Sequence, residues 1–260
     1  MKLRDALHAA ESRLASAGVD SPRVDAELLL AHVAGTTRSG LYADLDREVD
    51  GGWEPLVERR AKREPLAYVL GEWGFRRLTL KTDARALVPR PETEIVVERC
   101  LALLEGLDAP AVLDVGVGSG AMALALKDER PDARVVGVDV SKDALALAAE
   151  NARRLELEVE LRHGGVESAA SGWQLVVSNP PYVDTLDGLQ PELRHEPEGA
   201  LLGTGFHETI ARTARTRFLV LEVGDGQAEE VASVLRAAGY DGVTITPDLA
   251  GTDRVVEGRR

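Results

Sequence analysis

Apolar side chains recur at helical spacing through the first part of the chain. One stripe runs along a predicted helix at Leu3, Leu7, Ala10, Leu14 and Ala17. Gly18 ends that pattern, and Ser21 followed by Pro22 is typical of the start of a second helix. Shorter helical patterns follow in SGLYADL and EPLVERRAKR. Residues 1–70 are therefore predicted to form a small helical bundle domain, which on pattern alone is either plain structure or a recognition module.

The pattern then changes from helical to alternating. In PLAYVLGEWGFRRLTLK, glycines and aromatic residues precede an alternation of polar and apolar positions, which is typical of a turn and a β-hairpin. We expect residues 71–88 to form a hairpin that links two domains. Pro91, Glu92 and Glu94 then mark the start of a helix, because acidic side chains are favoured in a first turn.

From residue 111 onward, apolar runs of strand length alternate with amphipathic stretches. The predicted strands are AVLDVG, RVVGVDV, EVELRHG, WQLVVSN, RFLVLEVG, GVTITPD and DRVVEGR. Helical patterns separate several of them, in SGAMALALKDE, SKDALALAAENARR and GQAEEVASVLRAAG. This alternation predicts an α/β fold with a parallel sheet that is covered on both faces. We assign residues 89–260 to this second domain.

Composition narrows the class of protein. The chain has 260 residues, of which 44% are hydrophobic and 29% charged, and its net charge is −13. Nucleic-acid-binding proteins usually present a basic surface, so we expect no direct nucleic-acid partner. No apolar run is long enough for a membrane span, and the first residues do not resemble a signal peptide. We therefore expect a cytoplasmic protein without a membrane partner. We also expect it to be a monomer.

The cysteine and histidines offer little chemistry. The single cysteine, Cys100, lies in the apolar run IVVERCLALL, where we expect a packed thiol rather than a nucleophile. One cysteine also excludes an internal disulfide. The histidines show no metal-ligand spacing with one another or with Cys100, so the sequence predicts no metal site.

The stretch LDVGVGSGA joins the first predicted strand of the second domain to its helix. Gly116, Gly118 and Gly120 allow a sharp turn and a close approach of a ligand to the main chain. The free N–H groups at the helix start favour a negative group. Asp139 ends the next strand, where its carboxylate can accept hydrogen bonds from ribose hydroxyls. With Ala121 the stretch also satisfies the dinucleotide pattern, so nicotinamide cofactors and S-adenosylmethionine both fit it.

The stretch SNPPYV ends a later strand on the same edge of the sheet. Two prolines cannot continue a strand, and Pro181 pushes Pro180 toward an extended conformation. The Pro180 carbonyl and the Asn179 amide oxygen are then two acceptors for the hydrogens of a planar –NH2 group, and Tyr182 adds an aromatic face. Such a clamp would hold a delocalised, weakly nucleophilic nitrogen and aim its lone pair at an electrophile.

Six stretches together resemble a known family. They are, in chain order, PLAYVLGEWGF, VPRPETE, LDVGVGSGA, SNPPYV, HEPEGAL and DLAGTDRVV, and they resemble the PrmC/HemK protein-glutamine methyltransferases. The resemblance implies a Rossmann-like class I methyltransferase with a seven-stranded, mostly parallel sheet and an N-terminal helical domain that helps to dock the substrate. It also implies methyl transfer from S-adenosyl-L-methionine, which leaves S-adenosyl-L-homocysteine, to the glutamine of the GGQ motif in peptide chain release factors.

The resemblance also implies roles for individual residues. The implied cofactor-binding residues are Gly116, Val117, Gly118, Ser119, Gly120, Asp139, Gly164 and Asn179. The implied substrate-binding residues are Asn179, Pro180, Pro181, Tyr182, Arg90 and Glu92, of which Asn179, Pro180 and Tyr182 form the catalytic clamp. Gly164 stands where the family usually has an acidic residue at the adenine edge. The segment around 203–216 is shorter than the family norm, which predicts a trimmed helix or loop near the substrate entrance.

Three other hypotheses remain open on the sequence. A DNA or RNA amino-methyltransferase would use the same clamp on an exocyclic base amine, and it would need a basic groove. A nicotinamide dehydrogenase is supported by the glycine loop alone. A non-catalytic adaptor with a decayed cofactor site would explain Gly164.

Overall fold

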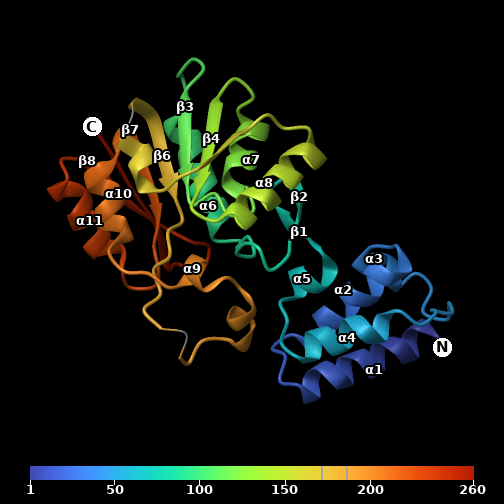
Figure 1. The fold of residues 1–260 in the computed structure, drawn as a ribbon. Coiled ribbons are helices and arrows are strands. Elements are labelled where there is room, and N and C mark those ends of the chain that lie inside the picture. Colours follow the sequence, from blue (N-terminus) through green and yellow to red (C-terminus); the bar gives the residue numbers. More distant parts are fainter. Residues whose placement is uncertain (171, 186) are drawn as a thin grey trace. The chain divides into compact units, whose positions relative to one another are not determined.

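The computed structural model describes residues 1–170, 172–185 and 187–260 (Figure 1). These residues separate into two compact units. The first is Met1–Glu72 with Leu189–His195, and the second is Trp73–Gly188 with Glu196–Arg260. Within the described part of the chain, no helix combines the length and hydropathy needed to cross a bilayer.

The first unit is helical, as predicted. Its helices are α1 (Leu3–Ser16), α2 (Pro22–Ala34), α3 (Arg38–Leu41), α4 (Trp53–Ala61) and α5 (Leu66–Leu70). The stripe expected on the first helix is buried except at Ala17, which follows the helix as its C-cap. The stripe belongs to one apolar cluster with residues of α2 and α4, including Leu29, Leu30 and Val57.

A segment from late in the chain completes the first unit. It contains the short 3-10 helix η2 (Pro191–His195). Glu192 accepts hydrogen bonds of 2.7 Å from both Arg60 and Arg63, and Arg60 also binds Asp25 at 2.7 Å. Burial opposes ionisation of Glu192, but the hydrogen bonds from Arg63 and Arg60 outweigh it and hold its pKa at about 2. The segment is therefore fixed to the helical unit by a charged contact that is largely shielded from water.

The second unit contains the predicted sheet. Its strands are β3 (Ala111–Val115), β4 (Arg134–Asp139), β5 (Glu160–His163), β6 (Gly172–Ser178), β7 (Arg215–Glu222), β8 (Asp241–Pro247) and β9 (Asp253–Arg259). They form a seven-stranded sheet in the order β5-β4-β3-β6-β7-β9-β8. The pairs from β5 to β7 are parallel, and β9 is antiparallel to both neighbours. The predicted α/β fold with a mostly parallel sheet is confirmed.

Helices cover both faces of this sheet. The helices of the second unit are α6 (Thr93–Leu103), α7 (Ala121–Glu129), α8 (Lys142–Leu155), α9 (Glu198–Leu201), α10 (Phe206–Thr213) and α11 (Ala228–Ala237), with the 3-10 helix η1 (Val166–Ala170). Val112 packs in a cluster with α6, α7 and α8, whereas the next residue, Leu113, packs in a cluster with α10 and α11. Adjacent residues of one strand thus support opposite layers.

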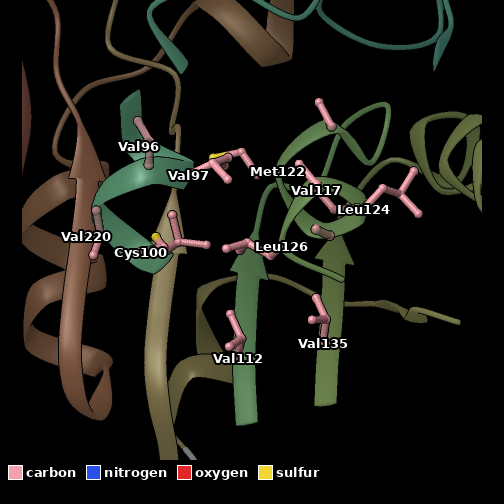
Figure 2. Packing of buried hydrophobic residues seen from close by; sticks show 14 of the residues in the cluster. Val96, Val97, Cys100, Val112, Val117, Met122, Leu124, Leu126, Val135 and Val220 are labelled. Carbon is pink, nitrogen blue, oxygen red and sulfur yellow. The ribbon is translucent and has the colours of Figure 1, made fainter. Parts of the chain in front are cut away.

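Cys100 lies inside the first of these clusters. Figure 2 shows it on α6 among the apolar side chains of Val112, Leu126 and Val220. The thiol is fully buried, and this burial raises its pKa well above the usual range. A thiol that is neutral and out of reach of solvent is a packing group, as the sequence predicts.

Two features near the sheet complete the unit. The expected hairpin consists of β1 (Glu72–Phe75) and β2 (Leu78–Lys81), which form a sheet of their own. The segment expected to be trimmed, around 203–216, contains α10, and the sequence patterns did not predict that helix.

The strand order and register bring the carboxyl ends of several strands together. β4 lies on one side of β3 and β6 on the other, so the carboxyl ends of β3 and β6 flank a topological switch point, where α/β sheets bind ligands. In the register, Val115 pairs with Val138 and with Ser178, and Ser178 pairs with Leu221. The residues that come next are therefore neighbours at one edge of the sheet: Gly116, Asp139, Asn179 and Glu222.

Candidate active site

A cavity of about 620 Å³ opens at this edge. Among the predicted site residues, its lining includes Arg90, Gly116, Val117, Gly118, Ser119, Asp139, Gly164, Asn179, Pro180 and Pro181. Of the remaining predicted residues, all within the described part of the chain, Glu92, Gly120 and Tyr182 are outside this lining. A shallower hollow of about 860 Å³ lies near the amino ends of β4 and β5, away from the candidate chemistry.

The glycine loop has a backbone that side chains would disfavour. Gly116, Gly118 and Gly120 have φ angles of 78°, 55° and 89°, all in the left-handed region. A Cβ on Gly120 would also lie 2.9 Å from Leu124 Cδ1 and 3.3 Å from Ala148 Cβ. Gly120 therefore shapes the loop from behind by letting it pack on α7 and α8, although it does not line the cavity.

Asp139 is held in place by the loops around it. Its Oδ2 accepts a 2.9 Å hydrogen bond from the Gly118 N–H, and its Oδ1 accepts one of 2.8 Å from the Ser141 N–H. Both carboxylate oxygens keep lone pairs for further donors. The side chain therefore joins the glycine loop to the start of α8 and presents a fixed acceptor to the cavity.

Asp114 is a second acidic group beneath the glycine loop, and the sequence patterns did not single it out. It is fully buried, and its Oδ2 accepts a 3.1 Å hydrogen bond from the Ala123 N–H. Burial raises the pKa of Asp114 to about 7, although that hydrogen bond opposes the shift. Its Oδ1 has no hydrogen-bond partner among the described residues.

Asn179 stands one strand away from the glycine loop. Ser178 anchors the strand end, because its hydroxyl donates to the Val115 carbonyl at 2.7 Å. The Asn179 Nδ2 donates to the Thr93 hydroxyl oxygen at 3.4 Å, which turns the amide so that Oδ1 is the atom left for a ligand. Pro180 and Pro181 continue the cavity wall.

Tyr182 comes next in the chain but does not line the cavity. Its ring stacks on His207 at a centroid distance of 6.5 Å, and its carbonyl accepts a 3.1 Å hydrogen bond from Gln227. A Cβ on Gly224 would lie 2.9 Å from the tyrosine ring, so a glycine is needed there. Burial raises the pKa of Tyr182 to about 12, with a further contribution from Glu222. The ring is therefore packed near His207 and Gly224 and is not part of the cavity lining.

Arg90 belongs to an ion pair that sequence patterns could not reveal. Its guanidinium binds Glu196, whose side chain is only 1% exposed, and the same carboxylate accepts a 3.0 Å hydrogen bond from the Val88 N–H. This pair ties VPRPETE to HEPEGAL, two stretches that contribute to the cavity wall. Glu92, by contrast, occupies the N-cap position of α6.

Glu196→Ala is expected to destabilise the second unit. The substitution would leave the Arg90 guanidinium and the Val88 N–H without their partner, at a cost of about 2 kcal/mol in the free energy of unfolding. Chemical denaturation of the full chain measures this loss. Glu198→Ala removes an exposed acid two residues later and is the matched control. Equal stability of the two variants would contradict the structural role of the ion pair.

Sequence reasoning also missed several residues of the cavity wall. They include Leu87, Thr93, Val140, Glu167 and Phe206. Val140 is 73% exposed, which is unusual for valine and places an apolar surface beside Asp139. It directly follows the predicted acid, so its position in the sequence was a usable signal.

The fold and the site define a Rossmann-like methyltransferase domain. A family profile described as "Methyltransferase small domain" matches residues 97–197, and one described as "PrmC N-terminal domain" matches residues 5–71. A solved structure with a similar fold is the T. thermophilus 16S rRNA N2 G1207 methyltransferase RsmC in complex with AdoMet and guanosine. It is 18% identical with a TM-score of 0.52, over 73% of this chain and 49% of that chain.

Sequence similarity over the full length of the chain identifies its family. The release factor glutamine methyltransferase of Deinococcus radiodurans is 42% identical over 279 residues, which cover 100% of this chain and 99% of that protein. The enzyme of the same name from Caulobacter vibrioides is 39% identical over 96% of this chain and 93% of that protein. The chain therefore belongs to the family of release factor glutamine methyltransferases.

Proposed function

We propose that this protein transfers a methyl group from S-adenosyl-L-methionine to the side-chain amide nitrogen of the glutamine in the GGQ motif of peptide chain release factors. The observation that carries the proposal is the position of Asn179 and Pro180, which share one cavity with the glycine loop and Asp139. The full-length similarity to release factor glutamine methyltransferases supports the choice of substrate. A substrate that acts in translation also supports a cytoplasmic location.

The cavity fits the proposed cofactor. Its volume of about 620 Å³ is in the usual range for a small-molecule site. The main-chain groups of Gly116–Gly118 would hold the methionine end, and the Asp139 carboxylate would accept hydrogen bonds from the ribose hydroxyls. When bound, the cofactor supplies a methyl group activated by a positively charged sulfur.

The adenine ring of the cofactor would contact groups other than an acidic side chain at position 164. A Cβ on Gly165 would lie 3.5 Å from Val140 Cγ1 and 2.9 Å from Glu167 Oε2, so the glycine backbone, Val140 and Glu167 are close together. Glu167 already accepts a 2.7 Å hydrogen bond from the Gly165 N–H. We infer that the apolar face of Val140 and this carboxylate compensate for the missing side chain of Gly164.

With the methyl group supplied by the cofactor, the role of the protein residues is to hold the substrate amide. The lone pair of the amide nitrogen is delocalised into the carbonyl group, so this nitrogen is a weak nucleophile. Asn179 Oδ1 and the Pro180 carbonyl would accept its two N–H groups and fix the direction from which the nitrogen approaches the methyl group. Positioning of this kind, with electrostatic support, can lower the barrier without a strong base, because the methylated amide loses its proton readily.

Labelled methyl transfer tests the proposal. The full chain is incubated with methyl-labelled S-adenosylmethionine and, in separate reactions, with a release factor, transfer RNA and duplex DNA. We expect label on the release factor, and we expect it to disappear when the GGQ glutamine is replaced. Label on RNA or DNA alone would instead support the amino-methyltransferase alternative, which uses the same clamp but is disfavoured by the net charge of −13.

A further inference from the structure

A buried carboxyl group lies next to the amide clamp and has no role in the site described so far. Glu222 is the last residue of β7, and the pairing of Ser178 with Leu221 places it beside Asn179 in the sheet. Its exposed fraction is only 2%, and its Oε2 has no hydrogen-bond partner among the described residues. Burying a carboxyl oxygen without a hydrogen-bond partner costs free energy, so we expect this group to have a function.

Thr93 connects this carboxyl group to the clamp. It is the first residue of α6, is 5% exposed and lines the cavity. Its side chain lies close enough to the Glu222 carboxyl group for hydrogen bonding to lower the pKa of that group, and its hydroxyl oxygen accepts the 3.4 Å hydrogen bond from Asn179 Nδ2. An ionised carboxylate can only accept, so the Thr93 hydroxyl must donate to Glu222 and accept from Asn179.

The direction of this chain of hydrogen bonds matters for the amide clamp. The clamp needs Asn179 to present its oxygen, because the substrate –NH2 group offers only donors. If the Thr93 hydroxyl donated toward Asn179 instead, the amide would turn over and present its own –NH2 group to the substrate. Two sets of donors would then face each other, and the clamp would be lost.

We propose that Thr93 and Glu222 are positioning residues that hold Asn179 with its amide oxygen toward the substrate. This inference rests on the proposed function, and it assigns a purpose to the threonine of VPRPETE and to the glutamate of LEVG. Neither residue would touch the substrate in this role. They act through the orientation of one side-chain amide.

The charges around Glu222 make this device sensitive to pH. Burial raises the pKa of Glu222 to about 7, and Glu92 adds to the shift, whereas the bond to Thr93 and the charges of Arg254 and Arg90 oppose it. Beyond the effect of burial, the charge of Glu222 also raises the pKa of Tyr182. His207, whose pKa is lowered by burial, has its Nε2 2.8 Å from the main-chain oxygen of Glu222. Below the pKa, the protonated carboxyl can donate to Thr93 and reverse the chain of hydrogen bonds.

Thr93 substitutions test the orientation directly. Thr93→Val keeps the shape but removes the hydroxyl, and we expect kcat for the release factor to fall roughly tenfold, as for one lost hydrogen bond. Thr93→Ser restores the hydroxyl and should restore kcat to within about twofold of the wild type. Calorimetric titration with S-adenosylmethionine should show unchanged cofactor affinity in both. Thr216→Val removes a buried hydroxyl at the other end of β7 and is the matched control.

Glu222→Gln supplies an independent readout if Thr93→Val fails to fold. In the wild type, kcat should fall as the pH is lowered through about 7, where the carboxyl gains its proton. The glutamine cannot titrate, so this decline should disappear in the variant. Full activity of Thr93→Val, failure of Thr93→Ser to recover, or an unchanged pH profile in Glu222→Gln would each overturn the inference. Absence of label on the release factor with the wild type would instead show that the proposed function is wrong.

Discussion

Asn179→Ala is expected to lower the rate of methyl transfer to the release factor by about a thousandfold, because it removes an acceptor that positions the reacting nitrogen. Pro180 would still accept one N–H group, but a single acceptor allows the amide to rotate away from the methyl group. Cofactor affinity should stay nearly intact, since the glycine loop and Asp139 do not depend on this side chain. Single-turnover kinetics with saturating cofactor, together with calorimetric titration of S-adenosylmethionine, measure both quantities.

Asn179→Asp is the matched variant for this experiment. It has the same size and keeps an oxygen that can accept from the substrate, so its loss of rate should be smaller than that of Asn179→Ala. A large loss of cofactor affinity with unchanged turnover in Asn179→Ala would show that the side chain serves the cofactor and not the substrate amide.

The parts of the site that follow strand ends could be predicted from sequence. Gly116 and Asp139 come directly after buried apolar runs, Asn179 comes one residue after another, and parallel strands bring their carboxyl ends to one edge. The order of the motifs along the chain was therefore enough to place them together. The fold class followed from the same alternation of strands and helices.

Contacts between loops could not be predicted in this way. Arg90 and Glu196 are separated by more than a hundred residues, and neither lies in a periodic pattern, so nothing in the sequence pairs them. Glu222 ends an apolar strand and resembles any polar residue that leaves a core. Its contact with Thr93 depends on how α6 packs against β7, which is a property of the folded unit.

The path of the chain after the NPPY segment was also beyond sequence patterns. Residues 189–195 belong to the helical unit, where Glu192 binds Arg60 and Arg63, although the flanking residues belong to the sheet unit. A prediction that places one domain boundary along the chain cannot detect a later segment that belongs to the first unit. Charge pairing, rather than hydrophobic periodicity, fixes this segment.

Asp139→Ala should weaken cofactor binding and leave turnover nearly unchanged, whereas Asn179→Ala should lower turnover and leave cofactor binding nearly unchanged. The substitution removes the proposed acceptor for the ribose hydroxyls and releases the N–H groups of Gly118 and Ser141, which loosens the glycine loop as well. Loss of charge-assisted hydrogen bonds of this kind corresponds to roughly a hundredfold rise in the Kd for S-adenosylmethionine. With saturating cofactor, however, kcat should remain within a few-fold of the wild type.

Asp143→Ala provides the control, because it removes one negative charge from the exposed first turn of α8 and leaves the cavity unchanged. Its Kd for the cofactor should match that of the wild type. We therefore expect Asp139 to govern cofactor affinity and Asn179 to govern turnover, because the two residues would bind the cofactor and the substrate at opposite ends of one cavity. If Asp139→Ala bound the cofactor normally, the carboxylate would serve only to brace the loop, and the placement of the ribose beside it would be wrong.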